Sequence, residues 1–170
     1  MKLKFRLTSL LCGFFWIAPW SVAHADLAIG QTAPAFSSTD ELGLPVTLSQ
    51  FKGKTVILYF YPKDGTPGCT QEAQSFRDHY AELTKLGAVV LGISFDDAES
   101  HKAFKNKETL PFPLLTSNQK AIAEAYGVGG IWLADRDTIV IGKDGKIKNI
   151  YRSVTATHHA TFLISELTKK

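Results

Sequence analysis

The sequence predicts an α/β domain in which helices flank a central mixed sheet. Two uncharged runs rich in β-branched and aromatic residues, 55–62 and 88–95, are typical of buried strands. Segments with apolar residues at helical spacing follow these runs. Residues 137–152 form two alternating strands around Asp144-Gly145, which is the pattern of a β-hairpin.

The first half of the chain leads to a strand followed by a helix. Residues 30–54 contain turns and short extended pieces before the strand at 55–62. Thr66 is a favoured helix N-cap residue, and Pro67 suits the first helical position. The helix that they begin is expected to end at Gly87.

The second half alternates in the same way. Its expected elements are a strand, a helix, a short strand, a helix, the hairpin and a final helix, at 88–95, 98–107, 112–116, 118–126, 137–152 and 157–167. Asn118 is the expected N-cap of the fourth of these, and Gly127 its end. This order favours a thioredoxin-like arrangement, in which the helix beginning at Thr66 leaves the carboxyl end of a central strand. Ligands of open α/β sheets bind at that edge.

The first 25 residues have the three parts of a secretory signal peptide. A basic start at Met1–Arg6 precedes an apolar stretch and the small-residue pattern Ala23-His24-Ala25. We expect cleavage after Ala25, which leaves one domain at 26–170 in the periplasm or outside the cell, with no stable membrane association. A retained anchor is the alternative, because the apolar stretch is slightly long for a signal and short for a membrane span.

The charge of the expected mature domain is balanced. The chain has 19 basic and 16 acidic residues, and removal of Lys2, Lys4 and Arg6 leaves 16 of each. The basic isoelectric point therefore belongs mostly to the leader, and it gives no reason to expect a nucleic-acid partner.

Sulfur becomes scarce once the leader is removed. Met1 and Cys12 leave with it, so Cys69 is the one sulfur atom of the expected mature domain. A disulfide within that domain is then impossible. One unpaired thiol in an oxidising compartment indicates a cysteine that is either buried and inert or reactive.

Cys69 falls in the first turn of the helix that Thr66 begins. Backbone N–H groups there lack partners within the helix, and the local field favours a thiolate over a thiol. This placement alone leaves open whether Cys69 reacts or merely packs beneath the turn.

The sequence lacks the motifs of several other kinds of cysteine chemistry. No Cys-x-x-Cys is present, and no cluster of metal ligands surrounds Cys69 in the sequence. His158 and His159 are adjacent, so they are expected at the surface or at a helix cap rather than as a zinc pair. A Cys-His-Asn hydrolase shows no local signature, although composition does not exclude it.

The segment around Cys69 resembles the active-site segment of the peroxiredoxins, in their bacterioferritin-comigratory (Q-type) subgroup. It reads FYPKDGTPGCTQEAQSFRD, with the core Pro62-x-x-x-Thr66-x-x-Cys69. The resemblance extends through the segments GQTAPAF, LSQFKGKTVILYFYP, VVLGISFD, FPLLTSNQKAIAEAYGV and IVIGKDGKI. It implies a thioredoxin fold and the reduction of hydrogen peroxide and organic hydroperoxides by a cysteine, with no metal and no organic cofactor.

The resemblance also implies roles for individual residues. Cys69 corresponds to the peroxidatic cysteine, Thr66 to the hydroxyl that engages peroxide, and Pro62 to the residue that shields the thiolate. Arg136 corresponds to the guanidinium that completes the pocket. Backbone N–H groups near Gly68 and Cys69 are expected to stabilise developing charge, since Gly68 permits a close approach.

Two of these assignments have structural alternatives. Arg136 stands between Asp135 and Asp137 and would equally suit an exposed ion pair. Thr66 would equally suit a plain helix cap. Tyr126 and Trp132 are expected to pack in the core or at its rim rather than to read substrate.

The chain departs from the resemblance at Gln74, where many members of the subgroup carry a second, resolving cysteine. A one-cysteine variant is therefore expected, as a monomer or weak homodimer, whose sulfenic acid is reduced by an external thiol. Glutathione, a thioredoxin-like protein or a small thiol would serve. With Gln74 in place the helix has no reason to unwind during the cycle.

Two other functions remain as alternatives. A thioredoxin-like thiol–disulfide oxidoreductase suits the segment TLSQFKGKTVILYF, although the missing Cys-x-x-Cys opposes it. A non-enzymatic redox-sensing module would use Cys69 to form a mixed disulfide with a partner.

Overall fold

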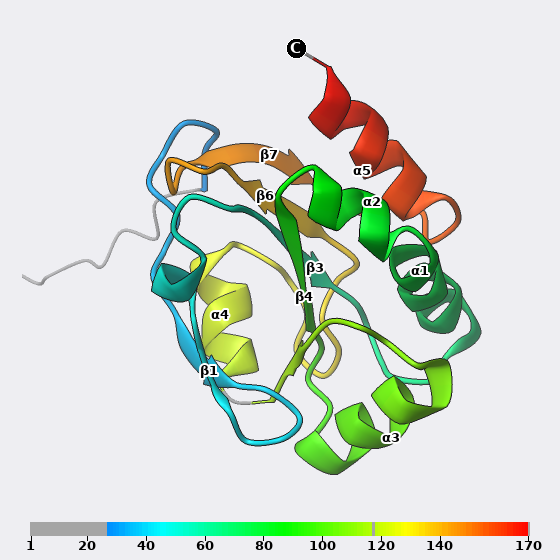
Figure 1. Cartoon of the computed structure of the whole chain (residues 1–170). Coiled ribbons are helices and arrows are strands. Elements are labelled where there is room, and N and C mark those ends of the chain that lie inside the picture. The colour runs from blue at the N-terminus through cyan, green and yellow to red at the C-terminus, as the bar shows by residue number, and fades with distance from the viewer. Residues whose placement is uncertain (1–26, 117, 170) are drawn as a thin grey trace, which may run out of the picture.

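The computed structural model describes residues 27–116 and 118–169 (Figure 1). The predicted signal peptide at 1–25 and its cleavage site lie outside the described residues. Within those two ranges, no helix has the length and apolar character needed to cross a membrane.

A five-stranded mixed sheet forms the centre of the domain, as predicted, with the strand order β5-β4-β3-β6-β7. The central strand β3 (Thr55–Phe60) pairs in parallel with β4 (Ala88–Ile93) and antiparallel with β6 (Thr138–Ile141). At the edges, β5 (Leu114–Leu115) runs parallel to β4, and β7 (Ile147–Tyr151) runs antiparallel to β6.

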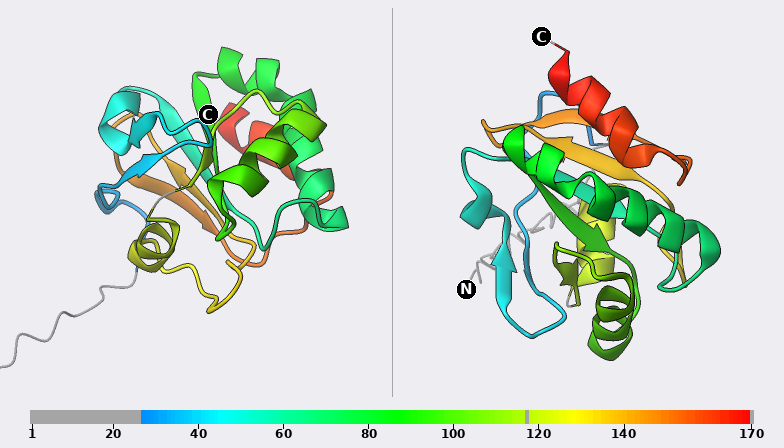
Figure 2. Two further views of the ribbon diagram at one scale, coloured as in Figure 1. Left: turned by 90° about the horizontal axis from the view of Figure 1, so that it is seen from below. Right: turned by 45° about the vertical axis from the view of Figure 1, so that its right-hand side comes forward.

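Helices cover both faces of this sheet (Figures 1 and 2). Four lie against one face: α1 (Pro67–Asp78), α2 (Tyr80–Lys85), α3 (Ala98–Glu108) and α5 (His159–Thr168). The other face carries α4 (Gln119–Ala125), with the small hairpin β1 (Ser37–Thr39)–β2 (Pro45–Thr47) and the 3-10 helix η1 (Leu48–Phe51) beside it.

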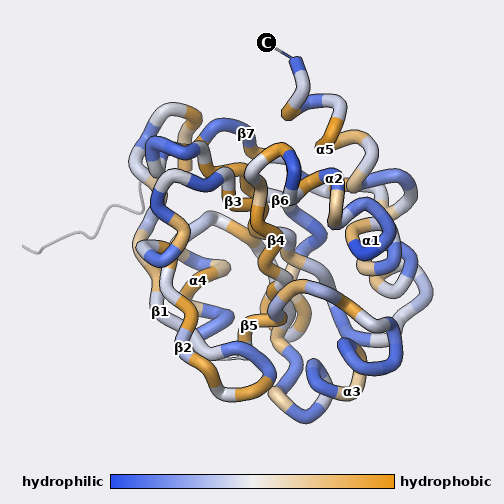
Figure 3. The backbone as a smooth tube through the Cα atoms, viewed as in Figure 1, coloured by the Kyte–Doolittle hydropathy of each residue, from blue (hydrophilic) through white to orange (hydrophobic). Residues whose placement is uncertain are grey.

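The central strand β3 is buried on both faces, which explains its uncharged sequence. Ile57 and Tyr59 point into the core beneath α1 and α5, whereas Val56, Leu58 and Phe60 point into the core beneath α4. All five are at most 1% exposed. Figure 3 shows the resulting hydrophobic colour along β3 and β4 in the interior of the molecule.

The single helix expected between Thr66 and Gly87 is instead two helices, α1 and α2, separated at His79. The backbone N–H of His79 and its Nδ1 lie 3.2 and 2.9 Å from the carbonyl oxygen of Ser75. The side chain thus competes for the acceptor of the last helical turn, and the backbone leaves the helical region at φ −105°. Gly87, at φ +77°, ends α2 as predicted.

The strand predicted at 112–116 is shorter than expected, because only Leu114 and Leu115 pair with β4. Pro113 has no N–H to donate, although its carbonyl accepts from Gly92 N at 3.1 Å. Asn118 stands at the N-cap of α4 as predicted, but its side chain does not cap the helix. Its Nδ2 donates to the carbonyl of Ser37 at 2.9 Å.

The predicted hairpin is confirmed. Gly145 adopts φ +74° at its tip, and its N–H donates to the carbonyl of Gly142 at 2.8 Å. The last helix was predicted from Thr157 and begins two residues later, at His159.

Candidate active site

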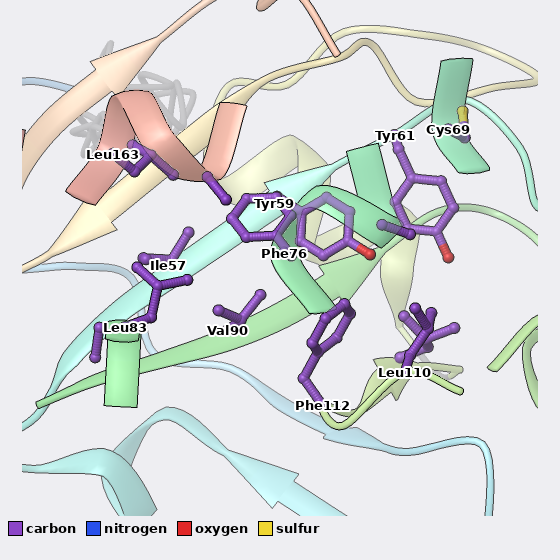
Figure 4. Packing of buried hydrophobic residues seen from close by; sticks show 14 of the residues in the cluster. Ile57, Tyr59, Tyr61, Cys69, Phe76, Leu83, Val90, Leu110, Phe112 and Leu163 are labelled. Atoms are coloured by element: carbon purple, nitrogen blue, oxygen red, sulfur yellow. The ribbon is translucent and has the colours of Figure 1, made fainter. Parts of the chain in front are cut away.

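Cys69 lies in the first turn of α1, just beyond the carboxyl end of β3. The turn forms because Thr66 is extended, at φ −72° and ψ 149°, while Pro67 supplies the first helical residue. Cys69 is 1% exposed and packs in the same core cluster as Tyr59 and Tyr61. Figure 4 shows it at the edge of this cluster, beside Tyr61.

Arg136 reaches the sulfur from the segment before β6. Its Nη2 lies 3.3 Å from Cys69 Sγ, and its Nη1 forms an ion pair with Glu72. The strand pairing explains this approach, because Phe60 and Asp137 exchange backbone hydrogen bonds of 2.8 and 3.2 Å at the end of β3. Arg136 therefore faces into the site rather than forming the exposed pair with Asp135 or Asp137 that its sequence neighbours allowed.

The neighbouring Asp137 has a different partner. Its carboxylate accepts from Arg152 Nη1 at 2.7 Å and from Ser153 N at 2.9 Å. These bonds tie the start of β6 to the end of β7, and so they fix the backbone from which Arg136 projects.

The charge on Arg136 is held by its two acceptors. Burial alone would lower the pKa of Arg136, but Glu72 and Cys69 beside it raise that pKa above its usual value. A guanidinium is thus fixed against the sulfur, with one arm on Cys69 and the other on Glu72.

Glu72 and His159 complete this cluster, although no sequence motif marked either residue as functional. Glu72 is fully buried, and its Oε1 lies 2.8 Å from His159 Nδ1. The expectation that both neighbouring histidines lie at the surface or a cap is wrong for His159, which is 2% exposed. It holds for His158, the exposed N-cap residue of α5. The signal for Glu72 was its position three residues after Cys69, on the same side of α1.

The other predicted site residues lie around the turn. Thr66 occupies the N-cap position, yet its hydroxyl donates to the carbonyl of Lys63 at 3.1 Å instead of capping α1. A Cβ on Gly68 would lie 3.4 Å from Arg136 Nη2, so this backbone passes close to the guanidinium. Pro62 is half-buried in the loop that follows β3.

A second polar cluster supports the loop between β3 and α1. Asp64 accepts from Tyr61 at 2.7 Å and from Ser100 Oγ at 2.8 Å, and its backbone N–H donates to Asp96 Oδ2 at 2.9 Å. His101, which is fully buried, lies 2.7 Å from Asp64 through Nδ1. No local sequence pattern indicated this cluster, because its members come from two segments, 61–64 and 96–101, that lie far apart along the chain.

This second cluster is also the candidate cation site within residues 27–116 and 118–169. The ligand atoms of Asp64, Asp96 and His101 lie within 4.8 Å of one another. Each residue is already hydrogen-bonded within the protein, since His101 Nε2 lies 3.1 Å from the carbonyl of Leu115 and Ser94 donates to Asp96 at 2.7 Å. The arrangement is that of a buried network that shapes the loop.

Comparison with known proteins shows that the chain is similar to members of one family. The model of the AhpC/TSA family matches residues 29–150. The chloroplastic peroxiredoxin Q of Sedum lineare is 46% identical over 132 residues, which cover 76% of this chain and 71% of that protein. A putative peroxiredoxin bcp of Coxiella burnetii is 41% identical over 153 residues, which cover 84% of this chain and 99% of that protein.

Solved structures agree with this similarity. Peroxidoxin BcpB from Mycobacterium tuberculosis superposes with a TM-score of 0.77 at 32% identity, covering 85% of this chain and 99% of that one. The bacterioferritin comigratory protein of Xanthomonas campestris, in a study of its alkyl peroxide reduction activity, has a TM-score of 0.75 at 29% identity over 83% of this chain and 95% of that one. The predicted thioredoxin-like fold is thereby confirmed.

Proposed function

Because the chain belongs to the AhpC/TSA family and is a thiol-dependent peroxidase of the peroxiredoxin Q type, we propose that Cys69 is the residue that peroxide oxidises. The observation that carries this assignment is the 3.3 Å contact between Arg136 Nη2 and Cys69 Sγ at the amino end of α1. A guanidinium and a helix N-terminus both favour the thiolate, which is the nucleophilic form of cysteine.

The proposed first step is an in-line displacement. The Cys69 thiolate attacks one oxygen of the peroxide, a sulfur–oxygen bond forms, and the oxygen–oxygen bond breaks. The departing oxygen takes the electron pair and a proton, and it leaves as water or as an alcohol. Sulfur is oxidised to a sulfenic acid, and the peroxide is reduced by two electrons.

The surrounding residues position the peroxide in this proposal. The Thr66 hydroxyl donates its proton to the Lys63 carbonyl, so its lone pairs are left to accept from a peroxide O–H. Backbone N–H groups at Gly68 and Cys69 stabilise the charge that develops on oxygen, together with Arg136. Pro62 shields the sulfur from bulk water.

We include organic hydroperoxides with hydrogen peroxide as substrates. The support is the similarity to the Xanthomonas campestris protein, whose structural study concerns alkyl peroxide reduction. Direct competition between hydrogen peroxide and an alkyl hydroperoxide for the reduced protein measures the preference.

The sulfenic acid is reduced by an external thiol in this proposal. Position 74, where a resolving cysteine is common, holds glutamine, and Gln74 Nε2 donates to Glu108 at 2.8 Å. A first thiol condenses with the sulfenic acid to give a mixed disulfide and water. A second thiol then releases Cys69 as the thiol and leaves as the disulfide of the reductant.

We further propose that the domain acts as a monomer or weak homodimer. We also propose that the protein is exported and that its leader is removed after Ala25. The support is the basic, apolar and small-residue order of residues 1–25. Expression with a C-terminal tag, followed by mass analysis of the exported fraction, tests it. A chain beginning at Asp26 is expected, and a full-length chain in the membrane fraction contradicts it.

The peroxidase proposal is tested by mass. Reduced protein mixed with stoichiometric hydrogen peroxide is expected to gain one oxygen on Cys69 within the mixing time, and Cys69→Ser is expected to gain none. With a thiol donor, the wild-type protein should consume peroxide and Cys69→Ser should not, and neither protein should reduce insulin. Slow oxidation of the wild type, or insulin reduction without peroxide consumption, contradicts the assignment.

A further inference from the structure

We propose that His159, on helix α5, is a positioning residue for the peroxidase reaction. By donating to Glu72 it holds that carboxylate in place, and Arg136 thereby keeps one arm free for the sulfur of Cys69. This inference rests on the proposed role of Cys69 and assigns a role in the site to the C-terminal helix, which contains no residue of the predicted catalytic set.

The four side chains form a continuous series of contacts. Arg136 Nη2 lies 3.3 Å from Cys69 Sγ, Arg136 Nη1 pairs with one oxygen of Glu72, and the other oxygen lies 2.8 Å from His159 Nδ1. Helix α5 packs directly on α1, which carries both Cys69 and Glu72 (Figure 2). The series therefore connects the sulfur to α5 through two shared partners.

Burial makes the second partner of Glu72 necessary. The Glu72 side chain is 0% exposed and that of His159 is 1% exposed, so water does not compensate this carboxylate. A buried carboxylate needs a donor on each oxygen to remain charged at low cost. Arg136 serves one oxygen of Glu72, and His159 serves the other.

The ring nitrogen of His159 that donates to Glu72 follows from its surroundings. Its Nε2 is buried without a hydrogen-bond partner among the described residues, and the Phe76 ring packs against the imidazole at 5.2 Å between centroids. A carboxylate oxygen can only accept, so Nδ1 carries the proton and donates to Glu72.

Loss of the His159 donor would affect the Cys69 sulfur through the Arg136 guanidinium. Arg136 would be the one remaining partner of Glu72 in the cluster, and its two arms match the two oxygens of a carboxylate. Bidentate pairing with Glu72 would draw Nη2 away from Cys69. Misplacement of such a group by about 1 Å costs on the order of 100-fold in rate.

The test compares two amides at position 159 with a matched change at its neighbour. An asparagine amide nitrogen occupies nearly the place of Nδ1, whereas a glutamine amide reaches the place of Nε2. We expect His159→Asn to keep a peroxide rate constant within about threefold of the wild type, and His159→Gln and His159→Leu to lose roughly 10- to 100-fold. His158→Asn, at an exposed left-handed position that asparagine tolerates, should match the wild type.

A second readout separates positioning from general destabilisation. The fraction of Cys69 present as thiolate at neutral pH, followed by its ultraviolet absorbance, should fall in His159→Gln and be retained in His159→Asn. In a double-mutant cycle, His159→Gln should cost little further rate once Glu72→Gln is present, because both act through the same carboxylate.

Three results would overturn the inference: equal rates in His159→Asn and His159→Gln, an unchanged thiolate fraction in a slow variant, or rate losses that add fully with Glu72→Gln. If His159→Leu fails to fold, the comparison of the two amides still decides the matter. Slow oxidation of the wild type itself would instead refute the role of Cys69, so the two failures are distinguishable.

Discussion

Arg136 Nη2 lies 3.3 Å from Cys69 Sγ, although 67 residues separate the two along the chain. The contact depends on antiparallel pairing of β6 with β3, which places the start of one strand at the end of the other. Because α1 begins at that same edge, the sulfur receives the helix N-terminus from one side and a guanidinium from the other.

The geometry of Arg136 predicts that a positive charge at this position is not enough for a fast reaction with peroxide. Arg136→Lys keeps a positive charge but cannot bond Cys69 and Glu72 with two arms of one planar group. We expect the rate constant for peroxide to fall by roughly 100-fold or more. Stopped-flow oxidation of the reduced protein measures it.

The matched control for that change is Arg77→Lys on α1. Arg77 is partly exposed, and its Nε pairs at 2.8 Å with the exposed Asp78. Its replacement should leave the rate unchanged. Comparable rates in both lysine variants would show that simultaneous contact of Arg136 with Cys69 and Glu72 is unimportant.

A second pair of variants tests the role of the Thr66 hydroxyl. Thr66→Ser retains the hydroxyl that donates to the carbonyl of Lys63. Thr66→Val removes this hydroxyl, but it keeps the shape of the threonine side chain and suits the extended backbone. We expect Thr66→Ser to stay near the wild-type rate and Thr66→Val to lose on the order of 100-fold. Thermal unfolding of both variants checks that the fold is retained, and an active Thr66→Val would reduce the role of Thr66 to structure.

Helix α1 is expected to stay folded when Cys69 is oxidised. Gln74 has no disulfide to form, and its amide is held by Glu108 at 2.8 Å. Hydrogen exchange of the backbone amides at 70–76 should therefore be the same in the reduced and sulfenic acid forms. Faster exchange in this segment on oxidation would mean that unwinding is part of the cycle even without a second cysteine.

Glu41 predicts how stability depends on pH. Burial alone would raise the pKa of Glu41, but Lys105 Nζ at 2.5 Å and the N–H of Leu114 at 3.0 Å lower it below its usual value. A carboxyl with a lowered folded pKa stabilises the fold above its unfolded pKa of about 4.3, and this contribution is lost as the pH falls through the folded value.

Glu41→Gln is therefore expected to lose roughly 1–3 kcal/mol of unfolding free energy at neutral pH. The difference from the wild type should shrink as the pH drops below about 4. Denaturant unfolding across a pH series measures it, with the exposed Glu82→Gln as control. A difference that stays constant on acidification would contradict the assigned role of the Glu41 charge.

Two buried tyrosines predict opposite responses to loss of their hydroxyl. Within the described part of the chain, the Tyr59 hydroxyl has no hydrogen-bond partner, whereas the Tyr126 hydroxyl donates to the carbonyl of Pro34 at 2.6 Å. Tyr59→Phe should leave stability unchanged or raise it by about 1 kcal/mol, and Tyr126→Phe should lower it by a similar amount. Equal losses in the two variants would indicate that Tyr59 is also satisfied.

Most of the scaffold was readable from local sequence patterns. The uncharged runs gave the two central strands, Gly145 marked the hairpin, and Pro67 marked the start of the helix that carries Cys69. These features are local, because strand period, turn chemistry and helix caps depend on residues a few positions apart. The break at His79 escaped prediction, since it depends on one side chain competing for a helix carbonyl.

The sequence by itself determined that Cys69 stands at a helix N-terminus beside a strand, and its resemblance supplied Arg136 as partner. Only the tertiary structure decided that Arg136 also binds Glu72, and that His159 is buried against that carboxylate rather than exposed like His158. Adjacent residues near the start of α5 face opposite environments once the helix packs on α1. Contacts among side chains from three separate segments depend on where the sheet and helices place them, and no local period records them.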